Sequence, residues 1–299
     1  MLRIIKRLWE LPPSEAAYKI KRRLTGRADT FDVQEIIRSP RLMRSQRFYD
    51  FFSRYEAILD RNVEWQPLEF EGRHVLEIGC GSLLGFGPMA LYRGAASYTA
   101  IEPWFDPCVF DEPAIVDSYF LAVFKDMVAL YGPRMEFPEF MELLKTRSRV
   151  VREPLLETTL TGPFDVVLSN SCLEHIFDFQ ESMVTLNGLC TTDCRHLHLV
   201  DFSNHRSTKS LFADLYAMEP ENYLKRFDDA INLLRPPDTL SAMREAGFDV
   251  GLVPVFHYKE FFEGPVHDYW TERYGEDDLF MATALIHGPL KTAGGEPQA

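Results

Sequence analysis

The sequence predicts an α/β protein built on an open, mostly parallel β-sheet with helices on both faces. Two observations lead to this class. Apolar segments of strand length alternate with helical segments that have one apolar face. One of the apolar segments, residues 74–79, runs directly into a turn rich in glycine. Strands that alternate with helices favour a parallel sheet joined by right-handed crossovers.

The individual elements follow from the hydrophobic pattern in chain order. Residues 42–61 are predicted as a helix, because Phe48, Phe52 and Leu59 recur at the spacing of one helical face. The first strand, 74–79, precedes a helix at 86–93. Further strands are expected at 97–102, 148–152, 164–169 and 196–202, with a helix at 178–189 and a closing antiparallel pair at 247–256 and 279–287.

Two long segments interrupt the alternation of strands and helices. Residues 107–147 and 203–246 are predicted as helical inserts within one domain that covers residues 42–288. The aromatic residues of these inserts are expected mainly in the core, with some part in a substrate lid. Residues 289–299 are rich in Gly, Pro and small side chains and are predicted as a flexible tail.

Residues 1–41 are predicted as a basic N-terminal arm. Lys and Arg outnumber Asp and Glu within residues 1–30, although the whole chain has a formal net charge of −13. Apolar residues such as Leu8 and Trp9 lie among the basic ones. Two interpretations stay open. The arm touches an anionic membrane surface or an acidic acceptor, or it is a solvated helix packed on the domain or on the second subunit of a homodimer.

The composition favours a cytoplasmic enzyme. Hydrophobic residues make up 46% and charged residues 26%, as is typical of globular proteins. The net charge of −13 argues against a nucleic-acid partner, which requires a basic face. No apolar run reaches the roughly 18 residues that span a bilayer. The 5 scattered cysteines favour a reducing compartment over a disulfide framework.

The turn after the first strand indicates a cofactor site. A pyrophosphate-binding turn has the pattern G-x-G-x-x-G, whereas here the third glycine, Gly85, comes one residue late. Glu77 precedes Gly79 by two residues and would add negative charge beside a phosphate. A carboxylate there suits a ligand with an ammonium group. S-adenosylmethionine (SAM) carries one and has no phosphate, whereas a nicotinamide cofactor remains a weaker alternative.

Four segments in chain order resemble the motifs of the class I SAM-dependent methyltransferases. The E-I-G-C-G turn at 77–81 is similar to the first motif, and residues 97–102 resemble a second strand ending in an acidic residue. The segments 164–176, which include L-E-H-I, and 196–202 resemble the fourth and fifth strands with their loops. The resemblance implies a Rossmann-like fold with a seven-stranded, mostly parallel sheet.

The cofactor site is expected at the carboxyl ends of the strands. Glu77 would take the methionine ammonium directly or through water, and Gly79 and Gly81 would let the backbone approach the ligand. The resemblance implies that Glu102 holds both ribose hydroxyls, and Pro103 with Trp104 would border the adenine. The expected cofactor-binding residues are Glu77, Gly79, Cys80, Gly81, Glu102, Pro103, Asn170, Ser171 and Cys172. Glu153 is a weaker candidate for the adenine amine.

Two histidines are candidate general bases for a hydroxyl acceptor. His175 follows the fourth strand, and His205 follows the fifth. A general base accelerates such a transfer by roughly 100- to 10,000-fold. The alternative for His175 is that it only shapes the cofactor pocket. A phenol or carboxylate acceptor, which ionises easily, would need neither histidine.

No metal is expected from the sequence. The spacing of Cys190, Cys194, His196 and His198 includes good zinc ligands but is not a common zinc pattern. A strand through 196–202 would carry both histidines into the sheet. No set of carboxylates suggests a magnesium-assisted enzyme.

The acceptor is expected to be a small molecule or a glycan. Residues 232–238 and 245–248 are similar to a pattern of methyltransferases from bacterial surface-glycan and polysaccharide clusters. This resemblance implies O-methylation of a sugar, a glycan or another small hydroxylated metabolite. Alternatives are a natural-product phenol or carboxyl methyltransferase and a non-catalytic SAM-binding or scaffolding subunit. Arg235 would bind an anionic acceptor or cap a helix.

Overall fold

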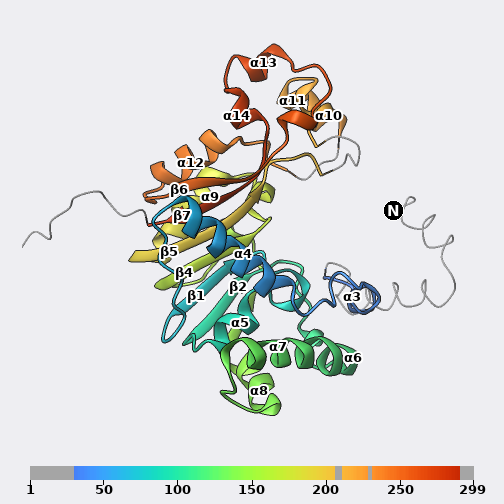
Figure 1. Ribbon diagram of the computed structural model, residues 1–299, viewed down its shortest axis with the longest axis vertical. Helices are drawn as coiled ribbons and strands as arrows, with labels where there is room; N and C mark the ends of the chain where they lie inside the picture. The colour runs from blue at the N-terminus through green and yellow to red at the C-terminus, as the bar shows by residue number, and fades with distance from the viewer. Residues whose placement is uncertain (1–29, 206–210, 228–230, 290–299) are drawn as a thin grey trace, which may run out of the picture.

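The fold is described by a computed structural model, which covers residues 30–205, 211–227 and 231–289. Its centre is a seven-stranded sheet with the order β3-β2-β1-β4-β5-β7-β6 (Figure 1). Strands β1 to β5 are parallel, and β7 runs antiparallel to both β5 and β6. The strands are β1 His74–Ile78, β2 Ser97–Ile101, β3 Ser148–Val151, β4 Phe164–Asn170, β5 Cys190–Asp201, β6 Gly251–His257 and β7 Met281–Gly288. The predicted fold class is therefore confirmed.

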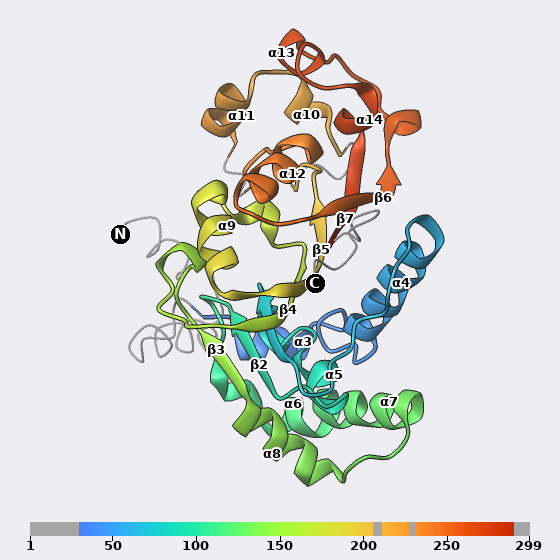
Figure 2. The same ribbon diagram turned by 90° about the vertical axis from the view of Figure 1, so that its left-hand side faces the viewer.

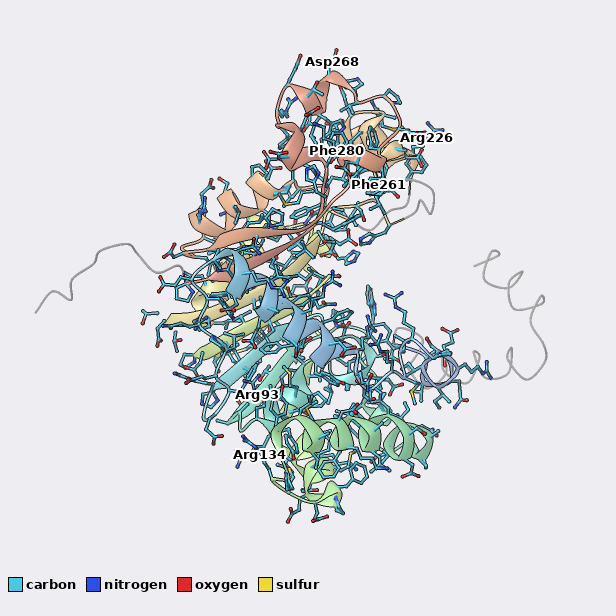
Figure 3. All side chains as sticks on the ribbon, viewed as in Figure 1. Arg93, Arg134, Arg226, Phe261, Asp268 and Phe280 are labelled. Atoms are coloured by element: carbon cyan, nitrogen blue, oxygen red, sulfur yellow. The ribbon has the colours of Figure 1, made fainter. Side chains whose placement is uncertain are left out.

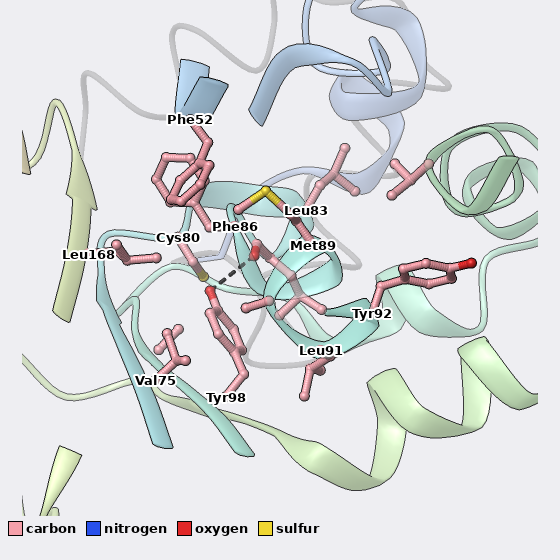
Figure 4. Packing of buried hydrophobic residues seen from close by; sticks show 14 of the residues in the cluster. Phe52, Val75, Cys80, Leu83, Phe86, Met89, Leu91, Tyr92, Tyr98 and Leu168 are labelled. Atoms are coloured by element: carbon pink, nitrogen blue, oxygen red, sulfur yellow. Dashed lines mark hydrogen bonds between the residues drawn. The ribbon is translucent and has the colours of Figure 1, made fainter. Parts of the chain in front are cut away.

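The central strands are buried on both faces, as expected for a parallel sheet covered by helices. Val75 and Leu168 face a core beneath α4 Arg47–Asn62 and α5 Gly87–Tyr92, which Figure 4 shows at close range. Leu76 and Val167 face the opposite core beneath α9 Phe179–Gly188 and α12 Pro236–Glu245 (Figure 2). The alternation of side chains along each strand thus distributes the apolar residues between two helical layers.

The largest error in a predicted strand boundary lies at the start of β5, and β6 also begins four residues later than predicted, at Gly251. β5 begins at Cys190 rather than at residue 196, because Cys190 already pairs with Phe164 at the start of β4. The register between the two strands shifts between Phe164 and Val166. Polar residues in 191–193 break the apolar pattern that marks a buried strand, so this first part of β5 carried no strand signal.

The first insert, 107–147, is helical as predicted. It contains α6 Pro113–Ile115, α7 Leu121–Tyr131 and α8 Phe137–Arg147. Three of its aromatic residues, Tyr119, Phe120 and Phe140, are buried in the same core as α5. α7 and α8 lie beside α5 at one end of the molecule (Figure 1). This insert therefore enlarges the core next to β1 and β2.

The second insert builds a separate core at the other end of the molecule. α10 Ala213–Tyr216 and α11 Pro220–Arg226 lie there with α13 Asp268–Thr271 and α14 Glu276–Leu279 (Figures 1 and 3). Tyr216, Trp270 and Phe280 belong to its buried cluster. The elements between β6 and β7 were not predicted from the sequence, because helices of four residues show no amphipathic period.

The described part of the predicted N-terminal arm packs on the domain. Asp32 caps α3 Val33–Arg38 by accepting from the Gln34 N–H at 2.9 Å. The Phe31 N–H donates to the Trp104 carbonyl at 2.6 Å, and Val33 is buried. The basic segment 1–29 and the tail 290–299 lie outside the described residues. Within the described residues, no helix combines the length and apolarity that a membrane span requires.

Candidate active site

A cavity of about 910 Å³ lies at the carboxyl ends of β1, β2 and β4. Its volume falls in the range of roughly 300–1,000 Å³ that is usual for small-molecule sites. The lining includes eight of the nine residues expected to bind the cofactor, namely Gly79, Cys80, Gly81, Glu102, Pro103, Asn170, Ser171 and Cys172. The topology therefore brings the glycine turn together with the loops that follow β2 and β4.

The glycine turn requires residues without a side chain. Gly79 and Gly81 have φ values of +74° and +63°, a region that favours glycine. A Cβ on Gly79 would lie 2.4 Å from the Cys172 Sγ atom. No atom lies within 4 Å of a Cβ built on Gly81, so its backbone borders open space. The turn thus exposes main chain to the cavity.

Glu102 closes the site at the end of β2. Its side chain is only 6% exposed, and Oε2 accepts the Gly81 N–H at 2.9 Å while Oε1 accepts the Trp104 N–H at 3.3 Å. Burial raises the pKa of this carboxyl, and the two N–H donors offset part of the rise. Each oxygen keeps further acceptor capacity, so the carboxylate can receive a pair of hydroxyls from a ligand.

Glu77 differs from the prediction, because it does not line the cavity. The side chain is fully buried, and Oε2 accepts the Phe86 N–H at 2.8 Å. The Tyr98 hydroxyl lies 2.7 Å from the same oxygen and 3.0 Å from the Leu84 carbonyl. Figure 4 shows the Tyr98 side chain in the surrounding core. Burial raises the pKa of Glu77 to about 8. The carboxyl group thus stabilises the glycine turn on the side away from the cavity. This position corrects the expectation of a direct contact with the ammonium.

The end of β4 and the loop after it carry three further expected residues, Asn170, Ser171 and Cys172. Asn170 accepts a hydrogen bond from the Tyr55 hydroxyl of α4. Ser171 has a φ of +49°, and its N–H donates to the Leu199 carbonyl at 2.9 Å. Burial raises the pKa of the Cys172 thiol well above its ordinary value, so this cysteine remains a neutral part of the wall.

The two candidate bases lie side by side. His175 ends the short 3-10 helix η5 Leu173–His175 and lines the cavity, whereas His205 follows β5 and does not. Their ring centroids are 5.0 Å apart. The His205 Nε2 atom lies 3.7 Å from Asp201 Oδ2. Burial alone would raise the pKa of Asp201, but hydrogen bonds from His205 and Ser203 outweigh it and lower this pKa.

The sequence did not identify the N-terminal wall of the cavity. Phe31, Arg41 and Arg47 line it, together with Phe48 and Phe51 of α4. The helical period of α4 correctly predicted a buried face, which includes Phe52 and Leu59. The helical period did not distinguish the α4 residues that pack against the sheet from those that line the cavity, because both sets are apolar.

The part of the cavity after β3 also differs from the weaker prediction. Pro154, Leu155 and Leu156 line the cavity after β3. Glu153 does not, and its Oε2 instead accepts the Thr159 N–H at 3.2 Å. An apolar wall suits a flat aromatic base.

Arg235 lies away from the cavity, at the border of the second core. It is 1% exposed, and its Nη1 donates to the Phe202 carbonyl at 2.8 Å and lies 3.0 Å from the Tyr216 hydroxyl. Its guanidinium also lies over the Trp270 ring, 5.9 Å from the centroid. Arg235 therefore joins the second insert to β5 rather than binding an acceptor.

The cysteine and histidine group on β5 lies at the opposite end of the strand from the cavity. Cys190, Cys194 and His196 have potential ligand atoms within 4.8 Å of one another. His196 and His198 are buried in the sheet as expected, and burial lowers the pKa of His196 to about 4. The structure also gathers a second group, Glu174, His175 and His205, at the cavity.

Comparison with known proteins identifies the family. The family model of a methyltransferase domain matches residues 43–252, so the chain belongs to this family. It is a methyltransferase enzyme, and the class I motifs around its cavity make SAM its methyl donor. No curated protein matches the sequence.

Several solved structures are similar. A SAM-dependent methyltransferase from Mesorhizobium loti has 15% identity and a TM-score of 0.41, covering 77% of this chain and 94% of that one. An O-methyltransferase family protein from Burkholderia thailandensis has 17% identity and a TM-score of 0.41, covering 86% and 62%. Haemonchus contortus phosphoethanolamine N-methyltransferase 2, in complex with SAM, has 14% identity and a TM-score of 0.42, covering 76% and 47%.

Proposed function

We propose that this methyltransferase transfers the methyl group of SAM to an oxygen of a sugar, a glycan or another small hydroxylated metabolite. The observation that carries the proposal is the pair His175 and His205, whose rings lie 5.0 Å apart beside the cofactor cavity. A hydroxyl is a weak nucleophile at neutral pH and gains from groups that handle its proton. A phenol or carboxylate would gain little from them.

The residues at the cofactor end of the cavity are proposed to hold SAM in a fixed position. Glu102 would accept the ribose hydroxyls, and the backbone at Gly79 and Gly81 would border the methionine portion. Glu77 Oε1 has no hydrogen-bond partner among the described residues. Glu77 would therefore contact the SAM ammonium through a water molecule bound to this oxygen, which is the second form of the predicted contact. Pro103 and Leu155 would enclose the adenine.

The acceptor end is proposed to handle the proton. SAM supplies a methyl on a sulfonium; as the acceptor oxygen forms its bond to that carbon, the carbon–sulfur pair returns to sulfur and the hydroxyl proton must leave. His175 lines the cavity and can reach an acceptor there, and His205 lies beside it with Asp201 behind. Alignment and exclusion of water supply the rest of the acceleration.

The choice of acceptor is supported by sequence and charge. Residues 232–238 and 245–248 resemble a pattern of methyltransferases from surface-glycan clusters, and the net charge of −13 disfavours nucleic acid. A carboxyl or phenol methyltransferase and a non-catalytic SAM-binding subunit are the competing functions.

The proposal is tested with isotopically labelled SAM and a panel of acceptors. Nucleotide sugars and bacterial glycans would be compared with phenols and carboxylic acids, and the methylated atom would be found by mass spectrometry. Label on a sugar or glycan oxygen, reduced in Glu102→Ala at limiting SAM, is the expected result. Label only on phenols or carboxylates, or cofactor binding without any transfer, would contradict it.

A further inference from the structure

We propose that Glu174, His175 and His205 form a binding site for a divalent transition-metal ion at the acceptor end of the cavity. This inference rests on the proposed function and specifies how the acceptor oxygen is held and activated. The three residues come from the loops that follow β4 and β5, adjacent parallel strands in which Ser169 pairs with His198. The sequence predicted no metal, because the three ligands lie in two separate loops.

The spacing of the candidate ligands fits a single ion. Each of Glu174, His175 and His205 offers one atom, and these atoms lie within 4.8 Å of one another. Two atoms bound at about 2.1 Å to the same ion are at most about 4.2 Å apart. Small side-chain rotations therefore bring all three to bonding distance.

Glu174 supplies the second observation. It is 3% exposed, and neither carboxyl oxygen makes a hydrogen bond of good geometry within the described part of the chain, although the backbone N–H groups of Glu174 and Asp201 face the carboxylate. Burial of a carboxylate without good hydrogen bonds is costly, and a cation beside it removes the cost. The position is built into the fold, because the Glu174 carbonyl accepts the Asn232 N–H at 2.7 Å. The Asn232 side chain further donates to the carbonyls of Leu173 and Ile176, at 3.0 and 2.9 Å.

Asp201 supports the site from behind His205. Its Oδ2 lies 3.7 Å from His205 Nε2, while its Oδ1 accepts the Ser203 N–H at 2.9 Å and the Ser203 hydroxyl at 2.6 Å. A carboxylate in this place commonly fixes the orientation of a metal-ligating imidazole. The carboxylates of Glu174 and Asp201 together also match the charge of a divalent ion.

The ligand set indicates the class of ion and of acceptor. Two imidazoles with one carboxylate favour Zn²⁺, Fe²⁺ or Co²⁺ over Mg²⁺ or Ca²⁺ and leave coordination positions open. His175 also lines the cavity, so an ion bound to it lies next to the space for the acceptor. A hydroxyl oxygen bound to such an ion loses its proton more readily, and the proton passes to solvent water rather than to a histidine that holds the ion. The acceptor is then one that presents a metal-binding hydroxyl, and both histidines act as ligands.

The test measures metal binding without turnover. The full chain is stripped with a chelator and titrated with Co²⁺, followed by calorimetry and by the visible absorption of bound cobalt. One saturable site per chain is expected, with Mg²⁺ weaker. Glu174→Gln and His205→Ala should each weaken Co²⁺ binding at least about tenfold, and Asp201→Asn by a similar factor. Because His205 is exposed, its variant tests the site even if Glu174→Gln is unstable.

The matched control is Cys190→Ser, since Cys190, Cys194 and His196 form the other candidate group. This variant should bind Co²⁺ as the parent does. Loss of binding only in Cys190→Ser, unchanged binding in His205→Ala, or no saturable binding would overturn the inference. Titration with SAM separates this failure from that of the proposed function, which requires SAM binding whether or not the metal binds.

Discussion

The two ends of the cavity differ in the groups that form them, which are mainly backbone atoms at one end and side chains at the other. The cofactor end uses main chain, with Gly79 and Gly81 in backbone conformations that favour glycine and Glu102 bonded to backbone N–H groups. The proposed acceptor end uses side chains, with His175 lining the cavity and His205 of a second loop beside it. A site formed by the main chain requires particular residue types at fixed spacing in the sequence. A site formed by side chains depends instead on which loops the sheet places side by side.

The largest effect is expected at the acceptor end. Replacing both His175 and His205 by alanine should lower kcat by roughly 100- to 10,000-fold, because the acceptor hydroxyl loses the groups that manage its proton. Affinity for SAM should stay within about threefold, since the cofactor end is untouched. Turnover and calorimetry on the same preparation measure both. If the double variant lost SAM affinity as much as turnover, the two histidines would contribute to SAM binding, and the proposed separation of the two ends would be wrong.

A smaller effect is expected from a single methyl group in the glycine turn. Gly79→Ala forces a Cβ within 2.4 Å of the Cys172 Sγ atom and keeps a positive φ, which should cost about 2–4 kcal/mol of unfolding free energy. Gly81→Ala is the matched control, because its Cβ meets open space and only the backbone cost of about 1–2 kcal/mol applies. Urea denaturation compares them. Equal losses would mean that the contact with Cys172 does not constrain the turn.

Glu102→Ala should weaken cofactor binding and also loosen the glycine turn, because the carboxylate accepts the Gly81 and Trp104 N–H groups. Loss of charged hydrogen bonds to a ligand costs about 1.5–3 kcal/mol, so Glu102→Ala should weaken SAM binding about 10- to 100-fold. Glu153→Ala serves as the control, because Glu153 bonds to Thr159 outside the cavity and should leave affinity unchanged. Calorimetric titration distinguishes the two. A comparable loss of SAM affinity in Glu153→Ala would indicate that the loop after β3 contacts the ribose or the adenine.

The smallest effect concerns pH. The folded-state pKa of Glu77 is raised from 4.5 to about 8, so its contribution to stability is present at pH 4.5 and is lost as the pH rises toward 8. Glu77→Gln keeps a neutral group there and should reduce this decline by at least about 1 kcal/mol, since one pKa unit equals about 1.4 kcal/mol. Unfolding free energies at pH 5 and 8 provide the measurement. An unchanged pH dependence would show that Glu77 is ionised in the folded protein.

Much of the fold was readable from the sequence, because buried parallel strands and glycine turns leave local patterns. The strands at 74–79, 97–102 and 164–169 appear close to their predicted bounds as β1, β2 and β4. The start of β5 and the helices near Trp270 were missed, because pairing and long-range burial rather than local period determine them.

Part of the cavity lining was predictable in the same way. The residues of the glycine turn and of the loop after β4 line the cavity as their motifs suggested. The inward direction of the Glu77 carboxyl and the burial of Arg235 depend on tertiary packing, which spacing does not reveal. The group of Glu174, His175 and His205 likewise arises only when β4 and β5 pair.

The first experiment to perform is calorimetric titration of the purified chain with SAM and its demethylated product, with NAD as the comparison. Saturable binding of SAM or its product at micromolar concentration, weakened in Glu102→Ala and absent for NAD, is the expected result. Failure to bind either compound, or tighter binding of NAD, would contradict the assignment of this cavity to SAM.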